Sequence, residues 1–116
     1  MQTNKDKNLI VELTFAFALK IIKYVEELES KRKYVIANQL LKSATSIGAN
    51  VREAQNAESK NDFIHKMKLA AKEADETEYW LSLCNASEGY PVIHSLKDDL
   101  LVISKILSKI ISSSKK

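Results

Sequence analysis

The sequence predicts an all-α protein that folds as an antiparallel up-down-up-down four-helix bundle, with a single domain over residues 1–116. The chain holds only two glycines and one proline, whereas folds built from sheets need many turns and therefore more of both residues. Hydrophobic residues make up 45% of the chain, which excludes a disordered protein. A single cysteine, Cys84, excludes a disulfide scaffold.

The first helix is predicted over residues 8–29. One face is formed by apolar residues spaced three or four apart, namely Ile10, Leu13, Phe17, Ile21, Tyr24 and Leu28. A second apolar row, Phe15, Leu19 and Ile22, lies on another side. One bundle core covers only one side of a helix, so the second row predicts a subunit interface.

The second helix is predicted over residues 34–56. Its apolar stripe consists of Ile36, Leu40, Ala44, Ile47, Val51 and Ala54. A small or polar row with the same helical spacing runs beside it, formed by Ser43, Ser46, Asn50 and Glu53. Gly48 lies in the middle of the helix, where glycine costs about 1 kcal/mol relative to alanine, so we expect a close helix contact there.

The third helix is predicted over residues 60–87 and the fourth over residues 93–112. Ser59 is placed to cap the third helix, and Gly89 and Pro91 are placed to end it. Its core face keeps a heptad spacing through Phe63, Met67, Ala70, Ala74, Thr77, Leu81 and Cys84. The fourth helix carries Leu101 and Val102 outside its main apolar stripe, a second indication of an oligomer.

The sequence contains no recognisable catalytic or metal-binding motif. Neither of its two histidines, His65 and His94, follows a glutamate by three residues, as di-metal sites in helical bundles require. Two glycines cannot form a glycine-rich phosphate loop. We therefore expect no metal ion, no cofactor and no enzymatic activity.

Four polar residues of the second and third helices allow two interpretations. Asn50 and Glu53 are predicted to meet Glu73 and Glu76 in a polar layer at the edge of the bundle. Such a layer can set the register of two helices. Paired carboxylates can also perform acid–base chemistry, but no other group in the sequence completes such a site.

The chain lacks the features of a membrane or secreted protein. The apolar start of the first helix is interrupted by Glu12, and no apolar run approaches the length of a membrane span. We expect a cytoplasmic protein that does not bind a membrane.

Positive charge gathers in residues 31–60, where six basic residues face two acidic ones, although the net charge of the whole chain is only +3. This segment is either a solvated helix end or a surface that neutralises nucleic-acid phosphates. The candidate phosphate contacts are Lys31, Arg32, Lys33, Lys42 and Arg52.

Two stretches, residues 39–54 and 70–81, closely resemble a bacterial family of four-helix-bundle proteins, as do Ser59, Asp62 and Phe63 and the closing Gly89-Tyr90. Its first members were found encoded by intervening sequences within large-subunit ribosomal RNA genes, and many carry a ribosomal-protein label. The family's polar positions correspond to Ser46, Asn50, Glu53, Ser59, Glu73, Glu76 and Glu78. The resemblance implies no catalytic role for them.

The resemblance also implies an antiparallel bundle that assembles into a homopentamer with a central channel. A related family, the accessory variability proteins of diversity-generating retroelements, is strongly basic and associates with nucleic acid and a reverse transcriptase. The present chain is less basic than that relative.

Three functions follow as hypotheses. The first is a non-enzymatic oligomer that binds RNA, DNA or a nucleic-acid enzyme through a basic surface. The second is a structural or protein-binding scaffold without nucleic-acid affinity, which docks partners on the acidic third helix or in the channel. The third is an enzyme that uses Asn50, Glu53, Glu73 and Glu76 with a divalent cation.

Overall fold

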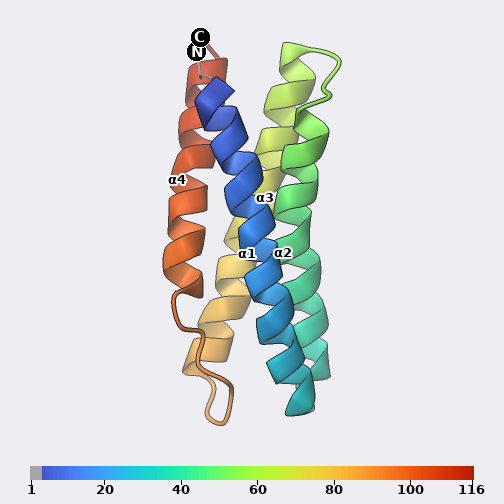
Figure 1. Ribbon diagram of the computed structural model, residues 1–116, viewed down its shortest axis with the longest axis vertical. Coiled ribbons are helices and arrows are strands. Elements are labelled where there is room, and N and C mark those ends of the chain that lie inside the picture. The colour runs from blue at the N-terminus through green and yellow to red at the C-terminus, as the bar shows by residue number, and fades with distance from the viewer. Residues whose placement is uncertain (1–3) are drawn as a thin grey trace.

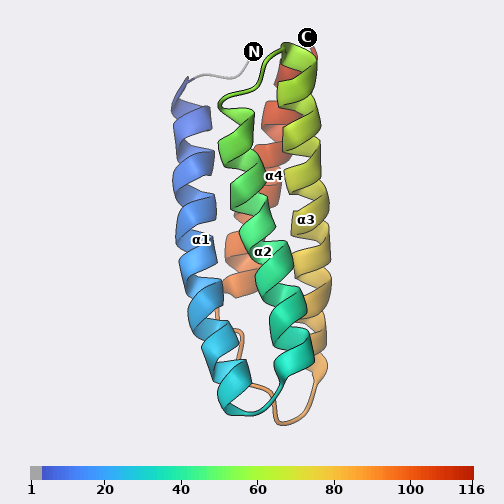
Figure 2. The same cartoon turned by 90° about the vertical axis from the view of Figure 1, so that its right-hand side faces the viewer.

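The computed structural model describes residues 4–116, with side chains described from Leu9 onward. Four helices form an antiparallel bundle of 47 × 22 × 19 Å (Figures 1 and 2). They are α1 (Asn4–Ser30), α2 (Tyr34–Ala54), α3 (Lys60–Ala86) and α4 (Leu96–Ser114). Residues 4–116 include no strand. The predicted all-α, four-helix architecture is confirmed.

The helices form a square in which α1 and α3 lie on a diagonal. α1 packs against α2 and α4, and α3 packs against the same two helices. The outer sides of α1 and α3 therefore point in opposite directions. The α2–α3 connection lies at the same end of the bundle as the start of α1 and the end of α4, and the other two connections lie at the opposite end (Figure 2). We call these ends the terminal end and the distal end.

The helix boundaries differ from the predicted ones mainly at the start of α4. The prediction began this helix at residue 93, but it begins at Leu96. His94 adopts a left-handed backbone conformation with φ 51°, which cannot belong to a right-handed helix. α1 begins four residues earlier than predicted and α2 ends two residues earlier.

The core consists largely of the apolar stripes that the spacing predicts. Three predicted stripe residues are only partly buried, namely Leu13, Ile36 and Phe63. Residues outside the predicted stripes are also buried, among them Thr14, Val25 and Ala37. Phe17, Ile21, Leu40, Met67 and Leu107 are among its largest fully buried side chains. The side chain of Tyr24 is buried as well, and its hydroxyl donates a hydrogen bond to the carbonyl oxygen of Pro91 at 2.8 Å. This bond ties the α3–α4 connection to α1.

The α1–α2 turn has an uncommon backbone conformation at Arg32, which has φ 62°. The Lys33 amide bonds the Leu28 carbonyl and the Arg32 amide bonds the Glu29 carbonyl, both at 2.9 Å. This bonding pattern is that of a Schellman motif, in which glycine is the favoured residue at the left-handed position. The turn therefore holds a basic side chain where a glycine would fit with less strain.

None of the helices that the structure describes is both long enough and apolar enough to cross a membrane.

Candidate interaction surfaces

The second apolar row of α1 remains exposed on the outside of the bundle. Phe15 is 58% exposed and Leu19 is 51% exposed, and Ile22 lies beside them. No residue whose side chain the structure describes covers this row, which agrees with the sequence pattern. The α1 face, defined as Phe15, Leu19 and Ile22, is an apolar surface of the kind that marks an interface.

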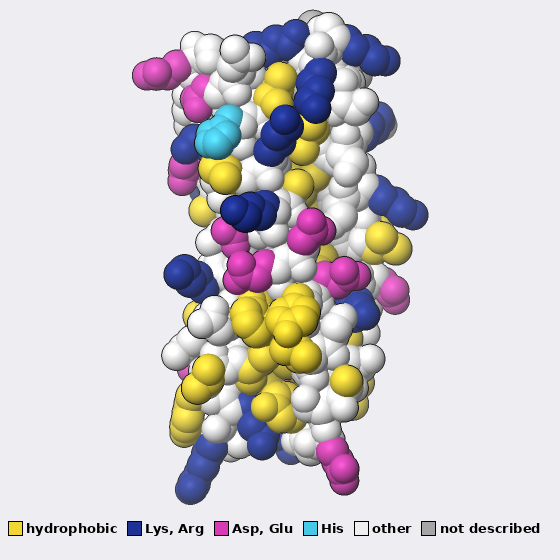
Figure 3. All heavy atoms as spheres, turned by 180° about the vertical axis from the view of Figure 1, so that it is seen from behind, with side chains coloured by type: hydrophobic (Ala, Val, Ile, Leu, Met, Phe, Trp, Pro, Cys, Tyr) yellow, Lys and Arg dark blue, Asp and Glu magenta, His cyan; other side chains and the backbone are white. Residues whose placement is uncertain are grey.

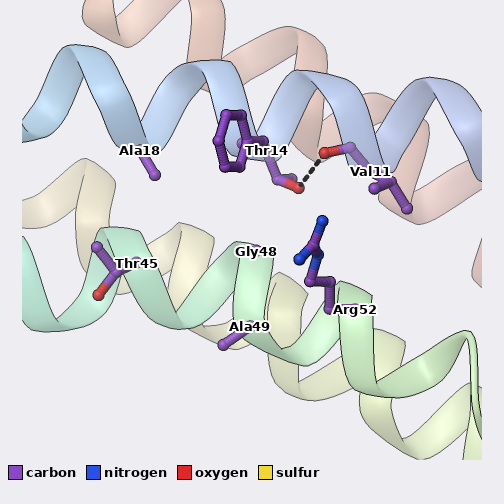
Figure 4. A pocket seen from close by; sticks show the side chains of 8 residues that line it. Val11, Thr14, Ala18, Thr45, Gly48, Ala49 and Arg52 are labelled. Carbon is purple, nitrogen blue, oxygen red and sulfur yellow. Dashed lines mark hydrogen bonds between the residues drawn. The ribbon is translucent and has the colours of Figure 1, made fainter.

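A shallow groove between α1 and α2 adjoins the α1 face. It has a volume of about 150 Å³, and Figure 4 shows small side chains along its α2 side. Its lining includes Phe15, Ala18, Thr45, Gly48 and Arg52. A methyl group added at Gly48 would lie 3.5 Å from Thr14, an ordinary van der Waals distance. Packing within the bundle therefore does not require the glycine that the sequence singled out.

The small and polar row of α2 lies along the α2–α3 seam. Ser43 and Thr77 are fully buried there, with their hydroxyl oxygens 2.9 Å apart. The Thr77 hydroxyl also lies 2.8 Å from the carbonyl oxygen of Glu73. Nearer the terminal end, the Lys66 ammonium bonds the Glu53 carboxylate at 2.9 Å. This bond raises the pKa of Lys66 above its ordinary value.

Three of the four side chains of the predicted polar layer, Asn50, Glu53 and Glu76, bond to partners outside it. The Asn50 amide donates to the carbonyl oxygen of Ser46 within α2, and Glu53 pairs with Lys66. Glu76 accepts a hydrogen bond from the Trp80 indole at 3.2 Å. Because Glu53 and Glu76 find partners elsewhere, the four side chains are not gathered into one acid–base site.

The remaining polar positions of the family-like set are Ser59 at the start of α3, Glu78 within α3 and Ser46 within α2. The Ser59 hydroxyl accepts a hydrogen bond from the Asp62 amide at 3.0 Å, as the sequence predicts for an N-cap. Glu78 is exposed. Ser46 bonds its own helix through the Lys42 carbonyl at 2.7 Å. The hydrogen bonds of Ser59 and Ser46 are local contacts with their own helices.

The five candidate phosphate contacts do not form one patch. Lys31, Arg32 and Lys33 lie in the α1–α2 turn at the distal end, whereas Arg52 lies near the C-terminus of α2. The rise along a helix separates Lys33 from Arg52 by about 28 Å. Lys42 lies between them on the exposed surface of α2. The Lys33 ammonium is 4.9 Å from the centre of the Tyr90 ring, a cation–π contact.

A basic surface that the sequence reading missed lies at the terminal end. Residues 100–116 contain four lysines and no acidic residue. They run beside the first half of α3, which carries four more lysines against one acid, Asp62. Lys60 bonds the carbonyl oxygen of Lys116 at 2.9 Å, which joins the two segments. Dark blue side chains crowd this end in Figure 3.

We call this surface the basic end. Its exposed members are Lys60, Lys68, Lys72, Lys105, Lys109, Lys115 and Lys116. The sequence contains one indication of this surface, because residues 100–116 carry four lysines and no acidic residue. The antiparallel packing of α3 against α4 was needed to place that tail beside the lysines of α3.

Two buried titratable groups lie together near the distal end. Burial raises the pKa of the Tyr24 hydroxyl well above its ordinary value, and the nearby Cys84 adds to the shift. Burial also raises the pKa of the Cys84 thiol, against a smaller opposing effect of the hydrogen bond with Tyr24. A raised thiol pKa makes Cys84 a weak nucleophile, as expected for a buried apolar cysteine. Among the described residues, no group of three or more His, Cys, Asp or Glu side chains is placed to hold a metal ion.

Comparison with known families decides the relationship of this chain. The family model described as "23S rRNA-intervening sequence protein" matches residues 6–109. The chain belongs to this family.

The solved structure of a similar protein has the same fold. That protein, from Bacteroides thetaiotaomicron, is described as a member of the S23 ribosomal protein family with unknown function. It is 40% identical to the present chain and superposes with a TM-score of 0.87, over 92% of this chain and 98% of the relative. A search of curated proteins found no match. The fold is therefore shared over almost the whole length of both chains.

Proposed function

We propose that this 23S rRNA-intervening sequence protein is a non-enzymatic, self-associating helical bundle of the cytoplasm that binds RNA or DNA through its basic end. The observation that carries the proposal is the segregation of charge along α3 and α4. Eight lysines and a single acid occupy residues 60–72 and 100–116 together. Such a density of one sign attracts a polyanion.

The geometry favours contact with phosphates over reading of bases. The basic end carries lysines on the exposed sides of two adjacent helices, a surface that can follow a phosphate backbone. Lysine side chains are flexible point charges that do not require one fixed geometry of the phosphate. We therefore expect binding that is sensitive to salt and tolerant of nucleotide sequence.

Self-association would strengthen this binding. The exposed α1 face and the groove beside it are candidate contacts between copies. We propose a homopentamer, the assembly that the family resemblance implies. Five copies of a chain with a net charge of +3 would carry about +15 in total.

The proposal is tested by fluorescence anisotropy with a structured ribosomal RNA fragment and with a DNA duplex of equal length. The logarithm of the binding constant should fall linearly with the logarithm of the salt concentration, by about 0.9 per duplex phosphate neutralised. Mass determination by light scattering on the same sample gives the number of copies. A folded sample without binding at low salt would support the protein-binding scaffold in place of the nucleic-acid function.

A further inference from the structure

The second half of α3 has a charge opposite to that of the basic end. Residues 73–96 contain five acidic residues and neither lysine nor arginine, whereas the rest of the chain carries 18 basic residues and the other ten acids. Four of the acids in this segment, Asp75, Glu76, Glu78 and Glu88, are exposed, and Glu73 is half-buried. None of the five takes part in either of the two ion pairs found in the described part of the chain, Lys20–Asp99 and Lys66–Glu53.

Exposed apolar side chains lie next to these acids on the outer side of α3. Glu76, Tyr79 and Leu83 are spaced three and four residues apart, so they share one stripe. Tyr79 is 58% exposed and Leu83 is 38% exposed. Figure 3, which views the α3 side, shows apolar surface directly beside a band of acidic side chains.

The aromatic part of this surface is held in place. The ring of Tyr79 meets the ring of Trp80 edge to face, with 5.2 Å between their centres. Glu76 accepts a hydrogen bond from the indole of Trp80, and Trp80 packs against the core. A surface with restricted aromatic side chains loses little conformational freedom when a partner covers it.

We propose that this surface, the α3 face formed by Glu76, Tyr79, Trp80 and Leu83 with Glu73, Asp75 and Glu78 around it, binds an amphipathic helical segment of a partner protein that is rich in lysine or arginine. Apolar residues of the segment would cover Tyr79 and Leu83, and its cations would face the carboxylates. This inference goes beyond nucleic-acid binding because the two surfaces have opposite charge and lie on different parts of α3.

Charge also decides against two other occupants of the α3 face. A nucleic acid would bring phosphates against the four acidic residues of the α3 face, and like charges in contact repel. A second copy docked through its own α3 face would bring the same carboxylates, and a copy docked through a different face, as in a ring, is distinguished by the dilution test below. A cationic amphipathic segment would be attracted by the carboxylates and could cover the exposed apolar side chains of the α3 face.

The experiment uses Trp80, the only tryptophan of the chain, as the reporter. A synthetic amphipathic helix of leucine and lysine, about 15 residues long, is titrated into the full chain while tryptophan emission is followed. A helix of the same leucine pattern with glutamate in place of lysine is the control peptide. We expect saturable binding of the lysine peptide, with a shift of Trp80 emission, and no binding of the glutamate peptide.

Variants separate the two parts of the surface. Asp75→Asn with Glu78→Gln should weaken binding of the lysine peptide about tenfold and reduce its salt dependence. Leu83→Ser should weaken it at all salt concentrations. Glu26→Gln with Glu29→Gln, an equal change of charge on exposed positions of α1, should leave it unchanged. Circular dichroism confirms that each variant keeps its helices.

Three results would overturn the proposal. They are no shift of Trp80 emission with the lysine peptide, equal binding of the glutamate peptide, and equal weakening by the α1 control variant. A shift of Trp80 emission on dilution of the protein alone would also overturn it, because the α3 face would then be covered by another copy. None of these results bears on anisotropy with RNA, so the nucleic-acid proposal stands or fails separately.

Discussion

Arg32 shows how a single residue combines a structural cost with a candidate function. Its left-handed backbone conformation ends α1 in a Schellman motif, where a residue with a Cβ atom is disfavoured by about 1–2 kcal/mol. Its side chain belongs to the basic run Lys31, Arg32 and Lys33 at the distal end. Arg32 therefore combines an unfavourable backbone conformation with a positive charge on the surface. Substitutions can separate the effect of the backbone strain from the effect of the charge.

Arg32→Gly should raise the free energy of unfolding by about 1 kcal/mol, because glycine adopts the left-handed conformation without strain. Urea denaturation followed by circular dichroism measures the change. Lys31→Gly is the matched control, since it removes a neighbouring cation at a position that does not have a positive φ. This substitution should not raise the free energy of unfolding. Equal effects of the two substitutions would contradict the strain at Arg32.

The buried pair Tyr24 and Cys84 should make the fold sensitive to alkaline pH. Both groups have a raised pKa in the folded state, so the folded protein holds their protons more tightly than the unfolded chain does. Their contribution to stability is fully present below the ordinary thiol pKa of 9.0, and it is lost as the pH rises toward the raised values.

Urea midpoints between about pH 8 and pH 10.5 should therefore fall more steeply for the natural chain than for the double variant Tyr24→Phe, Cys84→Ala. The variant has a lower stability at pH 8 because the bond to Pro91 is lost, so the slope with pH is the quantity to compare. Parallel slopes would show that this pair does not titrate with unfolding.

At the scale of the helices, heptad spacing was enough to predict which sides are buried. It identified most of the buried positions of the first three helices and the uncovered apolar row of α1. Spacing along one helix does not give the register between two helices, however. The buried contact of Ser43 with Thr77 and the pairing of Glu53 with Lys66 depend on that register, so the spacing could not predict either contact.

Gly48 lies in the α1–α2 groove. Its replacement tests whether this glycine is needed for folding or for contact between copies. Gly48→Ala should raise the free energy of unfolding of the isolated chain by about 0.5–1 kcal/mol, since the added methyl meets Thr14 at an ordinary distance. If the groove is a contact between copies, the same methyl should weaken self-association. Chemical denaturation and light scattering measure the two effects.

Gly89→Ala is the control for the same chemical change. Gly89 has φ 83° and no heavy atom within 4 Å of an added Cβ, so alanine should destabilise the fold by about 1 kcal/mol without affecting association. Unchanged association in Gly48→Ala would remove the groove from the interface.

At the scale of the whole molecule, the chain is a rod with charge sorted along it. The net charge of +3 conceals a basic end and an acidic segment of α3. The sequence predicted the acidic surface of the third helix but not the basic end, because the basic end is made by two segments about 40 residues apart that the antiparallel fold places side by side. The sequence therefore predicted a basic surface but concentrated it on residues 31–60, which the fold divides between the two ends.

The measurement that tests the central claim most directly compares two triple variants of equal charge change in nucleic-acid anisotropy. One variant is Lys68→Gln, Lys72→Gln, Lys105→Gln at the basic end, and the other is Lys31→Gln, Arg32→Gln, Lys33→Gln at the distal end. The basic-end variant should lose most of the affinity, with a salt slope smaller by about one for each phosphate contact removed, and the distal variant should bind almost as the natural chain does. Equal binding by the natural chain and the basic-end variant would contradict the account.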